Sequence, residues 1–264
     1  MAIRLKSAAE IEKMRVAGRL VATILRDLAA MCRPGTRTSE FEERSAALIR
    51  TAGAEPLFKN YPHYAGGKPY PATVCVSVNE EVVHGIPGDR AIREGDLVSF
   101  DVGVKLDGFC GDAAASVCVG QVDPRVKRLA EVTRQALEIA VRTIRSGIFW
   151  SSVAGRIETF VAEAGFSVVT DFVGHGIGAE MHEDPKLPNF VSRDLLRRDV
   201  LLQEGMTLAV EPMVNMGSHE VEHLADGWTV VTKDRQPSAH FEHTIAVAEG
   251  GGDVLTTLNG SRTL

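Results

Sequence analysis

The 264-residue sequence lacks several features that would assign it to a broad class. It has no apolar run of the ~18 residues that a membrane span needs, which argues against an integral membrane protein. Its first residues, Met1-Ala-Ile-Arg-Leu-Lys-Ser, bring charge too early for the apolar segment of a signal peptide, so we expect a cytoplasmic protein. No lysine or arginine tract stands out and the net charge is −6, which argues against nucleic-acid binding as its main role.

Cysteine is also scarce, and its spacing excludes the common cysteine scaffolds. The four cysteines form no C-x-x-C pair, so we expect reduced thiols at Cys32, Cys75, Cys110 and Cys118. The chain is 44% hydrophobic and 24% charged, an ordinary globular composition that excludes a disordered chain. Since no linker-like stretch divides the sequence, we expect one domain over residues 1–264.

Helical and strand patterns follow each other twice along the chain. A capping box at Ser7 and Glu10 predicts a helix that stops before Pro34, and a second helix is expected from Ser39 to about Gly53. The remaining ranges are a loop over 55–71, helices over 123–147 and 151–165, and strands over 74–78, 97–104, 109–119, 166–172, 207–214, 228–232 and 240–247. This repeated order predicts two similar lobes.

Two aspartates lie in one predicted hairpin. Asp107-Gly108 is a strong signal for a two-residue turn, which pairs residues whose numbers sum to 215. Asp101 then opposes Ala114, and Asp112 is its diagonal neighbour on the same face. A three-residue loop would instead separate the two carboxylates.

Two glutamates and one histidine share this unusual context. Glu211 and Glu242 stand in apolar strand patterns, where acidic residues are disfavoured, and His175 lies between glycines in Gly174-His-Gly-Ile-Gly178. Each residue alone is compatible with a solvent-facing or turn position. Buried together, four carboxylates would require about four positive charges, which predicts two divalent ions bridged by a water or hydroxide.

The motifs that contain these residues resemble those of type I methionine aminopeptidases, which have the pita-bread (creatinase-like) fold. The matching stretches are Ser77-Val-Asn-Glu-Glu-Val-Val-His84-Gly-Ile-Pro, Ser99-Phe-Asp101-Val-Gly-Val, Asp107-Gly-Phe-Cys-Gly-Asp112, Gly174-His175-Gly-Ile-Gly-Ala-Glu-Met-His182-Glu-Asp-Pro, Val210-Glu211-Pro-Met and Phe241-Glu242-His-Thr-Ile. They span most of the chain in the family order. The resemblance implies an α+β fold of two pseudo-symmetric lobes, each an antiparallel sheet covered by helices, in a single peptidase domain.

The resemblance also implies a role for each matching residue. The metal ligands would be Asp101, Asp112, His175, Glu211 and Glu242, with Asp112 and Glu242 bridging two ions of cobalt, manganese or iron. Glu211 would act as general base, and His84 and His182 would contact the substrate backbone. The plain alternative for the two histidines is a surface or turn position.

The methionine pocket is where the chain departs from the family pattern. The expected walls are Tyr70, Cys75, His84, Met181 and Trp228. Met181 stands where many relatives have Phe, and Val83 where many have Cys; residues 61–68 form a longer stretch than expected. These changes affect pocket shape rather than catalysis. Core packing is the alternative for Cys75 and Trp228.

The implied activity is removal of the N-terminal methionine, before a small second residue, by a metal-bridged hydroxide. The implied partners are the N-termini of peptides and nascent proteins. No membrane partner is expected, and the protein is expected to be a monomer. Docking on the ribosome is left open. Two alternatives stay open: an X-prolyl aminopeptidase or dipeptidase on the same fold, and a non-catalytic peptide-binding homologue. The former usually has an additional N-terminal domain, and the latter loses metal ligands.

Overall fold

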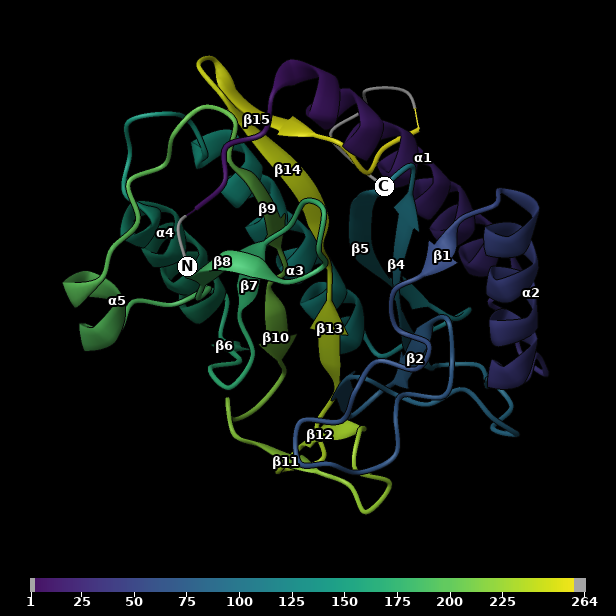
Figure 1. The fold of residues 1–264 in the computed structure, drawn as a ribbon. Helices are drawn as coiled ribbons and strands as arrows, with labels where there is room; N and C mark the ends of the chain where they lie inside the picture. The colour runs from purple at the N-terminus through teal and green to yellow at the C-terminus, as the bar shows by residue number, and fades with distance from the viewer. Residues whose placement is uncertain (1–2, 259–264) are drawn as a thin grey trace.

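The computed structural model describes residues 3–258 and has five helices within them (Figure 1). Their bounds are α1 Ala8–Met31, α2 Thr38–Thr51, α3 Pro124–Thr143, α4 Trp150–Glu163 and α5 Arg193–Arg197. The capping box of Ser7 and Glu10 begins α1 as predicted, and Asp123 caps α3 ahead of Pro124. None of the helices in this part of the chain is long and apolar enough to cross a membrane.

Four antiparallel sheets accompany the helices. The first contains β1 Glu55–Pro56, β2 Cys75–Val78, β4 Leu97–Leu106 and β5 Phe109–Cys118. The five-stranded sheet has the order β15 Gly251–Val254, β14 His243–Ala248, β9 Thr207–Val210, β7 Gly174–Gly176 and β8 Glu183–Leu187. The two small sheets are β13 Ser238–His240, β10 Met213–Asn215 and β6 Ser167–Val168, and β11 Val221–His223, β12 Val230–Thr232 and β3 Glu81–Val83. This is the expected α+β pita-bread fold.

Each pair of long helices packs over its own core. Helices α1 and α2 lie against the sheet of β4 and β5, and α3 and α4 lie behind β9, β10 and β14 (Figure 1). Phe41 and Phe100 are central to the first core, and Trp150 and Ile157 to the second; all four side chains are fully buried. Burial of such large apolar side chains contributes about 1.5–3 kcal/mol each. The cavity described below lies where the two halves meet.

Several element boundaries differ from those expected from the sequence. Helix α2 begins at Thr38, so its capping glutamate is Glu40, while Glu42 accepts hydrogen bonds from the amide and hydroxyl of Thr73. Helix α3 ends at Thr143 rather than near Gly147. Strands β1, β3, β7, β8, β11 and β15 and helix α5 were not predicted, because each is too short to give a clear hydrophobic period.

Gly18 of α1 shows how closely the helix approaches the segment that follows β15. A β-carbon at Gly18 would lie 2.4 Å from the carbonyl oxygen of Leu255. We therefore expect Gly18→Ala to destabilise the protein by about 1–2 kcal/mol, since overpacking outweighs the ~1 kcal/mol gain in helix propensity. The measurement is the free energy of unfolding in urea.

Gly155 of α4 provides the matched control. Its nearest neighbour, Val191 Cγ2, would lie at an ordinary contact distance of 3.4 Å from an added β-carbon. Gly155→Ala should therefore stabilise the protein by ~0.5–1 kcal/mol. Equal effects of the two substitutions would contradict the close approach of α1 to the backbone of Leu255.

Candidate metal centre

The hairpin of β4 and β5 has the predicted register. Asp107 and Gly108 both have positive φ, at 49° and 81°, as a two-residue turn of type I′ requires. Asp101 pairs with Ala114 as predicted, and Asp112 pairs with Gly103. The two aspartates are therefore diagonal neighbours on one face, and both line the same cavity.

Glu211 and Glu242 lie at two facing strand breaks, not inside continuous strands. The predicted strand 207–214 is divided into β9 and β10, and the predicted strand 240–247 into β13 and β14. On one side of the breaks Val210 pairs with His243, and on the other Met213 pairs with His240. Because the breaks are opposite each other, both glutamates enter the cavity from the same level.

A line of hydrogen bonds joins β5 to the β13–β14 segment. The amide of Glu242 donates to the carbonyl of Ala114 at 2.9 Å. One step along, the Thr244 hydroxyl donates to the Asp112 carbonyl at 2.8 Å and accepts from the Asp112 amide at 3.0 Å. At the other end, Ser116 bonds in the same two ways to the backbone of His240. These contacts hold Asp112 beside Glu242.

His175 faces these carboxylates from β7, where glycines allow the backbone to pass. A β-carbon at Gly174 would lie 2.4 Å from the Ala209 carbonyl oxygen, and one at Gly176 would lie 2.2 Å from that of Asp184. His175 Nδ1 is 2.8 Å from the Gly176 carbonyl, which can only accept, so the ring proton is on Nδ1. The lone pair of Nε2 then lies 3.5 Å from Glu211 Oε1.

The donor atoms converge without enough hydrogen-bond donors to satisfy them. One ligand atom each from Asp112, His175 and Glu242 lie within 4.8 Å of one another. Among the described residues, Asp101 Oδ1, Asp112 Oδ1 and Glu242 Oε1 are buried with no hydrogen-bond partner. Such orphaned oxygens are costly unless a cation binds them.

Burial and mutual repulsion act on every carboxyl group of this cluster. Burial raises the pKa of Asp112 to about 7, although the Ala113 amide opposes the change. For Asp101, burial and then the charge of Asp112 raise the pKa well above its ordinary range. Burial and the neighbouring carboxylates do the same to the pKa values of Glu211 and Glu242. Anions arranged in this way favour divalent cations.

The donor set fits a metal site. Carboxylate oxygens with one imidazole suit hard or borderline divalent ions better than thiolate-preferring ones. The hydrogen bond from His175 Nδ1 to the Gly176 carbonyl is the orientation that metal-ligating histidines usually have. The structure thus brings Asp101, Asp112, His175, Glu211 and Glu242 to the wall of one cavity of about 690 Å³.

His84 and His182 line the same cavity in neutral form. Burial lowers the pKa of His84 to about 4 and also lowers the pKa of His182. A cationic role for these two histidines is therefore not what the site favours near neutral pH. The His182 ring lies 4.4 Å from that of His175, and its Nδ1 is 2.8 Å from the Tyr61 hydroxyl.

The expected pocket residues all line the cavity. Tyr70, Cys75, Met181 and Trp228 join His84 there, and the Tyr70 hydroxyl donates to the Gly85 carbonyl at 2.8 Å. Val83, in contrast, packs in a core cluster with Val82, Val169, Met213 and Val230. Among the further wall residues that sequence reasoning missed are three aromatic ones, Phe58, Tyr61 and Phe172. Their only signal was aromatic character next to the predicted loop and the His175 motif.

Comparisons with known proteins show which family the chain belongs to. The model of metallopeptidase family M24 matches residues 12–249, so the chain belongs to that family. Methionine aminopeptidase 1 of Bacillus subtilis is 44% identical over 95% of this chain and 98% of its own length. A crystal structure of methionine aminopeptidase from Thermotoga maritima has a TM-score of 0.91 at 44% identity and covers 97% of this chain and 100% of its own. Within the family, the chain stands with the methionine aminopeptidases.

Other enzymes of the fold are more distant. The Xaa-Pro dipeptidase from Bacillus anthracis has a TM-score of 0.76 at 21% identity. The match covers 98% of this chain but 63% of that one. At this identity the likeness concerns the fold alone.

The raised pKa of Asp112 predicts a pH-dependent effect of Asp112→Asn on stability without metal. A carboxyl group with a raised folded pKa binds its proton more tightly in the folded state, so its destabilising effect grows as the pH rises from about 4 to about 7. The variant should therefore gain stability relative to the parent over this range, by up to about 4 kcal/mol.

The measurement is urea unfolding of both proteins in EDTA at pH 5 and pH 8. The buried histidines have lowered pKa values, which change the free energy of unfolding with pH in the opposite direction. Their contribution cancels when the free energies of the two proteins are subtracted. Addition of Mn²⁺ at pH 8 should stabilise the parent more than the variant. A stability difference between variant and parent that does not move in favour of the variant from pH 5 to pH 8 in EDTA would contradict the assigned electrostatics.

Proposed function

We propose that this chain removes the N-terminal methionine from peptides and newly made proteins, with two divalent ions held by Asp101, Asp112, His175, Glu211 and Glu242. The observation that carries the proposal is the set of buried carboxylate oxygens without partners at the wall of a largely apolar cavity. Manganese, iron and cobalt suit this donor set. When bound, such ions lower the pKa of water to about 7 and polarise a carbonyl group.

Glu211 is the residue that we assign as general base. Its carboxyl group lies in the cavity with Oε1 3.5 Å from His175 Nε2, and burial followed by the charges of Asp101 and Asp112 raises its pKa. A raised pKa makes a carboxylate a better proton acceptor. Glu211 thus takes a proton from the attacking water and holds it on its carboxylate until the leaving amine accepts it.

His182 and His84 stabilise the reacting peptide bond as neutral N–H donors. We assign the Tyr61 hydroxyl, 2.8 Å from His182 Nδ1, as the donor to that nitrogen, which keeps the ring proton on Nε2. In our assignment this proton is directed at the scissile carbonyl oxygen, where negative charge grows in the transition state. His84 is placed against Phe172 and Trp228, with ring centroids at 5.5 Å and 6.4 Å, and binds the substrate backbone.

The apolar part of the cavity suits a methionine side chain. Tyr70 and Trp228 meet edge to face with their ring centroids 5.3 Å apart, and Cys75 and Met181 add sulfur to the wall. Thioether, thiol and aromatic surfaces make favourable contacts with a flexible thioether. An X-prolyl peptidase remains the second candidate, since that activity also occurs on this fold.

Substrate choice and metal dependence test the proposal together. The metal-loaded protein should release methionine from Met-Ala-Ser and leave an Ala-Pro peptide intact, and EDTA should abolish the release until Mn²⁺ is restored. His175→Ala should lower kcat by ~1,000-fold or more while the melting temperature in EDTA changes little. Hydrolysis of the proline peptide alone would support the second candidate. A metal-loaded protein that cleaves neither peptide would reject both.

His182 has a separate prediction. His182→Ala should lower kcat by about 100-fold and change KM by less than about threefold, because its contact strengthens in the transition state. The measurement is steady-state kinetics on Met-Ala-Ser. Tyr61→Phe, which removes only the hydroxyl partner of Nδ1, should lower kcat less. A pure increase in KM for His182→Ala would count against this role.

A further inference from the structure

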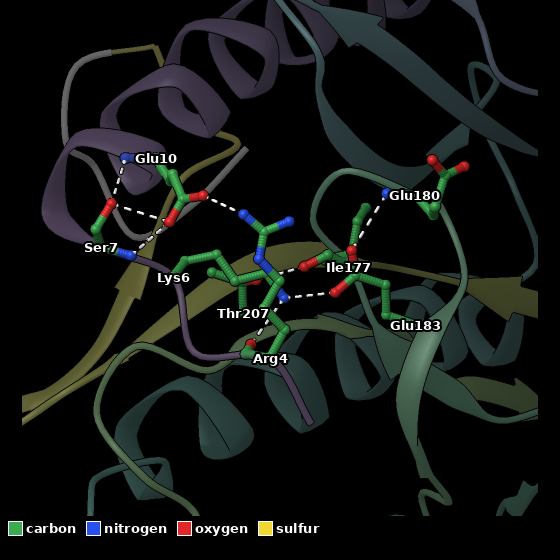
Figure 2. A network of polar contacts seen from close by, with 8 residues as sticks. All are labelled: Arg4, Lys6, Ser7, Glu10, Ile177, Glu180, Glu183 and Thr207. Atoms are coloured by element: carbon green, nitrogen blue, oxygen red, sulfur yellow. Dashed lines mark hydrogen bonds and ion pairs between the residues drawn. The ribbon is translucent and has the colours of Figure 1, made fainter. Parts of the chain in front are cut away.

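The buried ammonium group of Lys6 lies just outside the cavity, next to the segment that carries Met181 and His182. The Lys6 side chain is 2% exposed and Nζ donates to Glu183 Oε2 at 2.6 Å (Figure 2). Lys6 Nζ also donates to the backbone carbonyl of Arg4 at 3.1 Å. A lysine so deeply buried is rare, and its desolvation is offset only by such partners.

Glu183 uses its second oxygen to close the turn before it. Glu183 Oε1 accepts from the Glu180 amide at 3.2 Å, and the Gly178 amide donates to the Glu180 carbonyl at 3.0 Å. Burial alone would raise the pKa of Glu183, but Lys6 and the amides of Glu180 and Ala179 outweigh it and lower the pKa. The ionised carboxylate therefore joins Lys6 to the backbone of the turn over residues 178–183.

The Lys6–Glu183 pair is packed tightly against the glycine motif. A β-carbon at Gly178 would lie 2.4 Å from Lys6 Cε and 2.6 Å from Glu183 Oε1, so the pair occupies the space that a side chain would need. On the other side, the Lys6 amide donates to the Gly205 carbonyl at 2.7 Å. Lys6 is thus held at its backbone by the loop before β9 and at its tip by the turn.

His182 immediately precedes Glu183, and its ring is placed between Tyr61 and His175. It contacts Tyr61 through Nδ1 and lies edge to face against the His175 ring. The backbone of residues 178–183 therefore sets where the His182 ring can lie relative to the metal centre. A shift of about 1 Å in such a group is enough to cost up to 100-fold in rate.

We propose that Lys6 is a positioning residue for the reaction, acting through Glu183 to hold the turn that places His182 at the metal centre. The expected effect on turnover rests on the proposed function. The expected effect on the position of the His182 ring rests on the contacts of Lys6 alone. The acting groups are the ammonium of Lys6, outside the cavity lining, and the carboxylate of Glu183, which bonds to Lys6 and the turn. A residue in the segment that precedes α1 thereby influences the rate of turnover.

The test is a double-substitution cycle on the full chain loaded with Mn²⁺. Lys6→Met should lower kcat on Met-Ala-Ser by about 10- to 100-fold with KM within about threefold of the parent. In a His182→Ala background the same substitution should lower kcat by less than about threefold, because the group it positions is gone. A full, independent loss in that background would overturn the proposal.

Two further variants separate positioning from general damage. Glu183→Gln keeps an acceptor for either Lys6 or the Glu180 amide but not an ionised partner for both, so it should lower kcat in the same direction by a smaller factor. Arg15→Met removes another long-range ion pair of the N-terminal region, Nη2 of Arg15 with Asp253 Oδ2 at 2.7 Å, and should leave kcat within about twofold. Equal losses in Arg15→Met and Lys6→Met would overturn the proposal.

A readout without turnover distinguishes failure of this inference from failure of the proposed function. The imidazole nitrogen resonances of His182 should shift or broaden in Lys6→Met and stay unchanged in Arg15→Met, whether or not methionine is released from any peptide. Unchanged His182 signals in Lys6→Met would reject the positioning role. If Lys6→Met does not fold, Glu183→Gln serves for the cycle and for the spectra.

Discussion

The structure depends on gathering negative charge where the two halves of the chain meet. Four carboxylates and one imidazole lie at the wall of one cavity, and the same burial that excludes water raises the pKa values of the acids. No amount of apolar packing compensates for several ionised carboxylates held together in the interior. Divalent cations satisfy this arrangement, and so binding chemistry and folding energy are linked at this one place.

The surrounding framework is built to hold these charges against their repulsion. The hydrogen bonds between β5 and the β13–β14 segment connect the first sheet to the second half of the chain, and Thr244 contributes both a donor and an acceptor to Asp112. Facing breaks in two strand pairs direct Glu211 and Glu242 inward. The strands lose regular pairing at these breaks. Such local irregularity is typical of functional sites.

Local sequence patterns predicted the hairpin register correctly. They did not predict strand breaks that depend on pairing partners far away in the sequence. The Asp107-Gly108 turn alone defined the register that brings Asp101 and Asp112 together, because a two-residue loop allows only one pairing. The strands over 207–214 and 240–247 were expected to be continuous, since apolar or buried residues stand on both sides of each break. Only the switch of partners between sheets reveals the breaks. Helix α2 began one residue early for a similar reason, because Glu40 rather than Glu42 reached the backbone.

The sequence by itself determined the four long helices, the hairpin register and the residue types of the candidate metal centre, because these follow from local periodicity, turn chemistry and charge balance. The tertiary structure alone decided that the histidines are neutral, that Glu211 and Glu242 stand at facing breaks, that Val83 lies in the core, and that Lys6 meets Glu183 across 177 positions of the chain. Burial and long-range contact are made by residues far apart in the sequence. A pKa or an ion pair of this kind therefore exists only once the chain is folded.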